Sequence, residues 1–253
     1  MTPDPTVTQI AARLVEARRS GQQQPACEVT DAISAYAVQH AVARSLGWFP
    51  DGSAGHWKSG GASPHSVRTH APLPPHGVLR HPADVRASHF HMRGIEAEIA
   101  LRLRVPVNAQ IAASLDEAAA CVLIDSMCVA IEVVDSRWRE AMDAPVWARL
   151  ADLQSHGALV LGEWTAFRSG DWKHQACTVS IGTQATQHFQ GTHALGSPTA
   201  VLPQWLRHAT CAGTTVQAGT VVTTGTWCGL LQARRGDAVQ VAFDGIGVAQ
   251  VRF

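Results

Sequence analysis

The sequence has no excess charge of either sign, no long apolar run and a single tyrosine. Lysine plus arginine and aspartate plus glutamate each total 20, so nothing indicates binding to nucleic acid or to an anionic membrane surface. No run approaches the roughly 18 apolar residues that a membrane span needs. The opening stretch, MTPDPTVTQIAARLVEARRS, has no continuous apolar core, so we expect no signal peptide.

Paired cysteines are also missing. The six cysteines are scattered and form no Cys-x-x-Cys motif. This distribution is typical of reduced thiols, so we expect a cytoplasmic protein rather than a disulfide framework. The 253 residues are 46% apolar, which is enough to bury one sizeable core.

Two helices are predicted at the start of the chain. Val7–Arg19 has one apolar stripe and is followed by Gly21. The second helix follows a plausible N-cap at Thr30–Asp31 and extends to Gly47. Its buried side is expected to be Ile33, Tyr36, Ala37, His40 and Ala41.

Residues 48–81 are rich in Gly, Pro, Ser and His, which is typical of loops joined by short extended pieces. Lys58 lies there, in the segment GHWKSGG. Glycine lets a backbone and a ligand approach closely, so Lys58 is a candidate for contact with a ligand. A solvated loop lysine is the alternative.

The segment Ile95–Val105, IEAEIALRLRV, alternates apolar and charged residues and predicts a strand with one buried face. Glu96 and Glu98 then project from the same face, roughly 7 Å apart. Their repulsion can be relieved by solvent, by a shared proton or by a hard cation such as Mg²⁺ or Mn²⁺. A strand whose polar face is wet is the alternative to a metal site.

A third carboxylate, Glu132, lies inside the apolar run CVLIDSMCVAIEVV, whose end at Ile131–Val134 is predicted to be a buried strand. A buried carboxylate is costly unless it is paired, hydrogen-bonded or bound to a metal. The polar triplet Asp135–Arg137 follows directly, at a strand end where functional sites tend to collect.

The remaining pattern predicts an α+β protein, with a helical N-terminal portion that leads into a curved mixed sheet. We expect a single domain over residues 1–253, with helices and loops in 1–80 and a strand-rich, metal-binding part in 81–253. Two further helices are predicted, at Ala112–Ala119 and from Ser197 to about Ala209. Further strands are predicted at 158–161, 177–181, 186–189, 220–223, 229–232, 238–243 and 248–253.

The sequence resembles the fumarylacetoacetate hydrolase superfamily, and more closely its 2-hydroxypenta-2,4-dienoate (2-keto-4-pentenoate) hydratases and 4-oxalocrotonate decarboxylases. The most specific motifs are IEAEIAL at Ile95 and EVVDSR at Glu132. The other matching blocks are DAISAYAVQHAVA, KSG, ADLQSHGALVLG, ALGSPTAVLPQWL, AGTVVTTG and GDAVQVAFDGIGVAQVRF, so that the resemblance covers nearly the whole chain. It implies a sheet curled into a roll or partial barrel, and a homo-oligomer built on pentamers.

The resemblance also implies the roles of individual residues. Glu96, Glu98 and Glu132 match the family's carboxylate ligands for Mg²⁺ or Mn²⁺, and Lys58 matches a lysine that faces the substrate across the metal. Asp152 and Ser155 match substrate-binding positions in the same pocket. The metal assignment agrees with the independent interpretation of the three carboxylates.

The implied activity is that of a lyase that adds water to a short 2-hydroxy-2,4-dienoate and forms a 4-hydroxy-2-oxo acid, in the catabolism of aromatic compounds. Decarboxylation of a 4-oxalocrotonate-type acid uses the same metal and chelate, and hydrolysis of a C–C bond in an acylpyruvate is a third possibility. A non-catalytic partner subunit is the alternative from another class. It is motivated by departures from the family pattern at KSGGA, at PPHG and at Leu153, all on the substrate side.

The thirteen histidines offer competing sites. His89 and His91 are spaced for a zinc site, but no third ligand has a recognisable spacing. His76, His156 and His193 are candidate proton donors near the pocket, with a solvated or hydrogen-bonded core histidine as the alternative for each.

Overall fold

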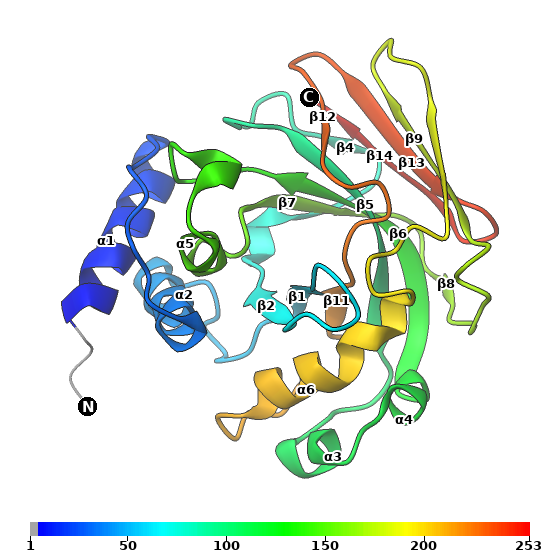
Figure 1. Cartoon of the computed structure of the whole chain (residues 1–253), viewed down its shortest axis with the longest axis horizontal. Coiled ribbons are helices and arrows are strands. Elements are labelled where there is room, and N and C mark those ends of the chain that lie inside the picture. The colour runs from blue at the N-terminus through cyan, green and yellow to red at the C-terminus, as the bar shows by residue number, and fades with distance from the viewer. Residues whose placement is uncertain (1–4) are drawn as a thin grey trace.

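Residues 5–253 are described by a computed structural model, in which a strongly curled mixed sheet is surrounded by helices and by a second, smaller sheet (Figure 1). The predicted α+β class and the curved mixed sheet are confirmed. Within residues 5–253, no helix combines the length and the apolar character required to cross a membrane.

The large sheet has the order β2-β1-β11-β5-β6-β7-β3, with β12 added beside β5 and β8 beside β6. Its strands are β1 (His56–Gly60), β2 (Thr69–Pro72), β3 (Val78–Arg80), β5 (Gly94–Leu103), β6 (Ile124–Val134), β7 (His156–Leu161), β8 (Thr165–Ala166), β11 (Val221–Thr223) and β12 (Leu231–Gln232). The long central strands β5 and β6 carry the three candidate carboxylates. Three strands of this sheet come from the first 80 residues, where we expected mainly helices and loops.

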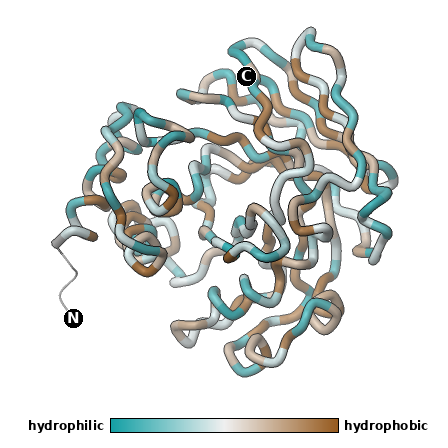
Figure 2. Tube along the Cα trace, in the orientation of Figure 1, coloured by the Kyte–Doolittle hydropathy of each residue, from teal (hydrophilic) through white to brown (hydrophobic). Residues whose placement is uncertain are grey.

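The second sheet has the order β10-β9-β13-β14-β4 and packs against the outside of the curled sheet, mainly on β6 (Figure 1). Hydrophobic and hydrophilic positions alternate along its strands, as expected for a sheet with one buried face (Figure 2). Its strands are β4 (Ala83–Asp84), β9 (Ala176–Ile181), β10 (Gln187–Gln190), β13 (Ala238–Phe243) and β14 (Gly247–Arg252). Val179 and Val241 join Val129 and Ile131 of β6 in the main core.

The helices form two groups (Figure 1). The group α1 (Pro5–Ser20), α2 (Ala32–Leu46) and α5 (Val146–Ala151) shares a separate hydrophobic cluster centred on Leu14, Val38 and Trp138. The group α3 (Ala109–Ala113), α4 (Glu117–Cys121) and α6 (Leu202–Thr210) lies across the open side of the curled sheet. Three short 3₁₀ turns, η1 (Pro75–Gly77), η2 (Ala141–Asp143) and η3 (Pro198–Val201), complete the described elements.

The helices predicted at 7–19 and 31–47 are confirmed, but the predicted buried side of α2 is wrong. Ile33 is 81% exposed, whereas Val38, Gln39 and Val42 are buried. Alanines occur all round this helix, so apolar periodicity does not fix its face. The face is set by packing against α1 and α5, and by the buried Gln39 amide, which donates to the carbonyl oxygens of Leu150 (2.6 Å) and His70 (3.3 Å).

The single helix predicted at Ala112–Ala119 is also wrong. Two short helices, α3 and α4, stand in its place. Asn108 and Asp116 each cap one of them, accepting from the backbone N–H of Ile111 (2.9 Å) and Ala119 (2.8 Å). The side chain of Asp116 therefore begins a new helix where we expected the interior of one.

Candidate metal centre

Glu96, Glu98 and Glu132 converge in the hollow of the curled sheet. Each offers one carboxylate oxygen, and these oxygens all lie within 4.8 Å of one another. Glu98 and Glu132 are buried, at 1% and 0% exposure, and Glu96 is partly buried. Among residues 5–253 this is the only cluster of three or more His, Cys, Asp or Glu side chains with such geometry.

The strand register brings the three carboxylates together. Strands β5 and β6 are antiparallel, with Glu96 directly opposite Glu132. Glu98 lies two residues further along β5, and therefore on the same face. The alternate residues Ile95, Ala97 and Ile99 project from the other face into the main core, which holds β5 in this orientation.

Lys58 lies on β1, two strands from β5 in the sheet, and not in a loop. Its side chain is buried, and Nζ donates to Glu132 Oε1 at 2.5 Å and to the carbonyl oxygen of Gln154 at 3.2 Å. The structure therefore does not support the alternative of a solvated loop lysine. It places the predicted catalytic ammonium against one of the predicted ligands.

The electrostatics of the cluster indicate a shortage of positive charge. Burial raises the pKa of Glu96 to about 8 and that of Glu98 to about 7, and repulsion from the other carboxylates adds to the shift. Burial alone would lower the pKa of Lys58, but the three carboxylates outweigh it and raise this pKa, so the lysine is protonated. One ammonium faces three carboxylates, and a divalent cation would supply the missing charge.

The donor atoms fit a hard divalent cation. The cluster offers only carboxylate oxygens, which Mg²⁺, Mn²⁺ and Ca²⁺ prefer. Glu132 Oε2 is fully buried without a hydrogen-bond partner, as expected of an oxygen that has a ligand to bind. Glu98 Oε2 accepts from the backbone N–H of Gly225 at 2.8 Å, which holds that carboxylate in place.

A cavity of about 350 Å³ opens onto this centre. Lys58, Glu96 and Glu98 line it together with Arg149, Gln154 and His193. Sequence reasoning did not find Arg149 and Gln154. Each also has one buried polar atom without a hydrogen-bond partner, Nε of Arg149 and Oε1 of Gln154.

An unusual turn brings Gln154 to the site. Leu153, Gln154 and Ser155 all have left-handed backbones, with φ of 53°, 54° and 58°. This conformation costs about 1–2 kcal/mol for each residue that has a Cβ atom. The turn follows the end of α5 and directs the Gln154 carbonyl to Lys58, so we interpret it as strain retained to shape the site.

Asp152 and Ser155 do not line this cavity. The carboxylate of Asp152 accepts from Arg137 Nε (2.7 Å), the Arg137 backbone N–H (2.9 Å) and Arg18 Nη2 (3.0 Å). The hydroxyl of Ser155 is buried without a hydrogen-bond partner. Substrate contact by these two residues stays a prediction, and the placement of Asp152 between two arginines indicates a structural contribution.

The histidines are divided between different surroundings. His156 is buried, with Nδ1 3.2 Å from Glu132 Oε1, and burial keeps its pKa well below the usual value. His193 lines the cavity, and burial lowers its pKa to about 4. Both are therefore neutral near pH 7, which does not favour imidazolium proton donors. His76, His89 and His91 line a different cavity.

The curled sheet and its oxygen-only acidic centre define a class of α+β proteins with a candidate site for a hard divalent cation beside a small-molecule cavity. Residues 52–253 match the model of the fumarylacetoacetate hydrolase C-terminal family, and the chain belongs to that family. No curated protein matches the chain by sequence alone.

Solved structures share the fold at low sequence identity. The 4-oxalocrotonate decarboxylase from Pseudomonas putida G7, complexed with magnesium and adipate, superposes with a TM-score of 0.84 at 19% identity, over 100% of this chain and 99% of that one. Its complex with calcium and acetate gives a TM-score of 0.82 at 19% identity, with the same coverage. The 2-hydroxyhepta-2,4-diene-1,7-dioate isomerase from Mycobacterium marinum gives 0.57 at 16% identity, over 78% of this chain and 73% of that one.

Proposed function

We propose that this protein is a divalent-metal-dependent hydratase that adds water to a short 2-hydroxy-2,4-dienoate and forms a 4-hydroxy-2-oxo acid, in the catabolism of aromatic compounds. The observation that carries the proposal is the convergence of three carboxylates and the Lys58 ammonium at one cavity. The magnesium and calcium complexes of the Pseudomonas decarboxylase support the use of a divalent cation.

In this proposal Glu96, Glu98 and Glu132 hold Mg²⁺ or Mn²⁺, and the bound cation supplies Lewis-acid stabilisation of negative charge on the substrate's 2-oxygen. Lys58 is held by Glu132 and by the Gln154 carbonyl, so its position is fixed before the substrate arrives. Because it is protonated, it is suited to donate a proton or to hold developing negative charge.

Decarboxylation of a 2-oxo-enedioate is the second candidate, and one observation favours it. Arg149 lines the same cavity as Lys58, and its buried Nε has no partner. A guanidinium group is well suited to hold the second carboxylate of a diacid. The hydratase substrate has no such second carboxylate, whereas a 4-oxalocrotonate-type acid does.

The two candidates are tested with a panel of 2-hydroxydienoates and 2-oxo-enedioates in the presence of Mg²⁺ or Mn²⁺. We expect loss of the dienoate's ultraviolet absorbance and a 4-hydroxy-2-oxo acid product by NMR. Release of CO₂ from the diacid, lost in Arg149→Gln, would identify a decarboxylase instead. Hydrolytic cleavage of acylpyruvates would identify the third alternative. A metal-loaded protein that turns over none of these compounds would favour the non-catalytic partner subunit.

We also propose a homo-oligomer built on pentamers. Large apolar side chains are exposed in the single chain, including Ile33, Val67 and Val122, and could be covered by neighbouring copies. Light scattering at micromolar concentration should give a mass well above the 27.0 kDa of one chain. The cytoplasmic location expected from the cysteines stays a prediction.

A further inference from the structure

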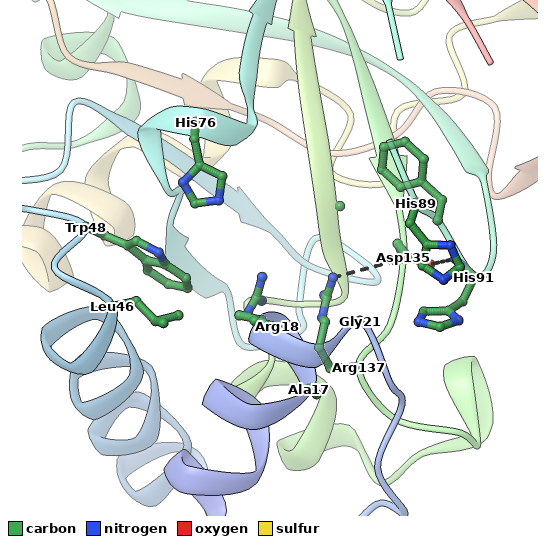
Figure 3. Close-up of a pocket in the computed structure, with 12 residues that line it drawn as sticks. Ala17, Arg18, Gly21, Leu46, Trp48, His76, His89, His91, Asp135 and Arg137 are labelled. Carbon is green, nitrogen blue, oxygen red and sulfur yellow. Dashed lines mark hydrogen bonds and ion pairs between the residues drawn. The ribbon is translucent and has the colours of Figure 1, made fainter. Parts of the chain in front are cut away.

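A second cavity, of about 470 Å³, lies between the N-terminal helices and the end of β6. It shares no lining residue with the cavity at the carboxylate centre. Figure 3 shows the side chains of Arg18 and Arg137 at its centre, with Trp48 and His76 on one side and His89 and His91 on the other. A cavity of this size is typical of sites for small molecules.

The two arginines are held together by one carboxylate. Arg18 Nη2 and Arg137 Nε both donate to Asp152 Oδ1, at 3.0 Å and 2.7 Å. The other nearby carboxylate, Asp135, is turned toward the backbone, because its Oδ1 accepts from the N–H groups of His91 and Met92 at 2.8 Å each. Its Oδ2 forms a long ion pair with Arg137 Nη1 at 3.9 Å, so that it balances charge there but accepts no hydrogen bond from the guanidinium group.

Both guanidinium groups therefore keep unused donors. Arg18 Nε and Arg137 Nη2 are buried and have no hydrogen-bond partner, and Arg137 as a whole is only 8% exposed. Burial and the neighbouring Arg137 charge lower the pKa of Arg18 to about 9. Buried donors on charged groups are rarely left unsatisfied in native proteins, so this pair of guanidinium groups in the lining of a cavity is a candidate site for an anion.

The walls of the cavity are aromatic. Trp48 and Phe90 line it, the ring centroids of Trp48 and His76 are 6.2 Å apart, and the guanidinium carbon of Arg18 lies 5.1 Å from the centre of the Trp48 ring. The parts of these rings that line the cavity favour a flat, apolar ligand body over a small hydrated anion.

We propose that this cavity binds a small organic carboxylate with a planar, apolar body, its carboxylate held by Arg18 and Arg137 and its body packed against Trp48. The site is separate from the proposed active site, and its occupancy needs no metal. A carboxylate that spans two guanidinium groups gains charge-assisted hydrogen bonds from each of them.

Benzoate is a suitable probe because it has one carboxylate and one flat ring. Calorimetric titration of the EDTA-treated protein with benzoate should show saturable binding, and acetate, which lacks the ring, should bind at least about tenfold more weakly. Arg18→Gln should weaken benzoate binding by roughly 10–100-fold. Arg13→Gln is the matched control, because Arg13 is an exposed arginine on the same helix, and should bind benzoate like the parent protein.

A second variant tests the same cavity in case Arg18→Gln fails to fold. His76 is exposed at the rim, so His76→Trp should narrow the entrance without removing a buried charge, and should also weaken benzoate binding. Glu98→Gln, at the carboxylate centre, should leave benzoate binding unchanged. No saturable binding to the parent protein, equal affinity for acetate, or loss of binding in Glu98→Gln but not in Arg18→Gln would each overturn the proposal. Failure of the hydratase assay would leave this binding test unaffected.

Discussion

The two cavities lie on either side of the end of β6 and differ in the sign of the buried groups that lack partners, carboxylates in one and guanidinium groups in the other. Glu132, on the strand, belongs to a centre where buried carboxylates hold raised pKa values. Arg137, beyond its end, belongs to a cavity where a buried arginine has a lowered pKa. In both places burial disfavours the charged form of a group, and a neighbour of like charge adds to the shift. The carboxylate centre lacks positive charge and so favours a cation, whereas the arginines are matched by Asp152 and Asp135 and offer hydrogen-bond donors to an anion.

The largest effect should come from Lys58→Ala, which separates chemistry from metal binding within the acidic centre. An ammonium is not a metal ligand, so affinity for Mg²⁺ should be nearly unchanged, while turnover should fall by ~10²–10⁴ if Lys58 is a general acid. Lys173→Ala, at an exposed lysine, is the control. Steady-state kinetics and metal titration measure the two quantities. A fully active Lys58→Ala variant would show that Lys58 has no chemical role, and joint loss of metal would make it structural.

The next effect concerns Asp152, which accepts hydrogen bonds from Arg18 and Arg137 at the second cavity, called the basic cavity from here on. Asp152→Asn leaves two buried guanidinium groups without their shared charge and should lower the free energy of unfolding by about 3 kcal/mol, measured in urea. The exposed pair of Arg102 and Asp125 offers a control, because Asp125→Asn should cost less than about 1 kcal/mol. If Asp152→Asn is as stable as the parent protein but loses turnover, the substrate-binding role predicted from the sequence is correct.

A smaller effect is expected for Glu98→Gln. A neutral ligand in place of an anionic one should weaken Mg²⁺ binding by at least ~10-fold, the loss typical even of outer-shell groups. Excess Mg²⁺ should then partly restore activity, which it would not do for Lys58→Ala. Glu163→Gln, at a side chain that is 77% exposed, provides a matched control. Unchanged metal affinity in Glu98→Gln would remove Glu98 from the ligand set.

The smallest effect is a pH dependence of the metal-free protein. The pKa values of Glu96 (about 8) and Glu98 (about 7) lie above the ordinary value of 4.5, so the folded state binds protons more tightly than the unfolded state. The stability that they contribute is complete below pH 4.5 and is lost as the pH rises through 7 and 8. The melting temperature in EDTA should therefore decrease from pH 5.5 to pH 8, and it should decrease by more than the melting temperature with Mg²⁺. If the melting temperature depends on pH in the same way with and without Mg²⁺, the carboxylates at the metal centre do not have raised pKa values.

Local sequence patterns predicted the strands well. The alternation in IEAEIAL correctly placed Glu96 and Glu98 on one face, and the apolar run around Glu132 correctly indicated a buried strand. These predictions succeeded because side chains alternate between the two faces of a strand, and this alternation is visible within a short stretch of sequence. The face of α2 and the division between α3 and α4 were predicted wrongly, because both depend on contacts or caps outside the apolar pattern.

Other site features had little or no local signal. Gln154 reaches the cavity in a left-handed turn that follows α5, and none of the three residues in that turn is a glycine. Nothing in ADLQSHG indicates such a turn, because its strain is maintained by surrounding contacts. The basic cavity was missed for a related reason, since Arg18 and Asp152 are 134 residues apart and meet only through helix packing.

Local patterns were enough to predict the α+β class, the central strands and the shared face of Glu96 and Glu98, because each follows from short-range periodicity. Their assignment with Glu132 as metal ligands came from the family resemblance. Three contacts are set by the packing of distant segments: Lys58 meets Glu132 across the sheet, Arg149 and Gln154 line one cavity, and Arg18 and Arg137 share Asp152. Those contacts join segments that are far apart along the chain, and local sequence patterns do not predict which distant segments lie close together in space.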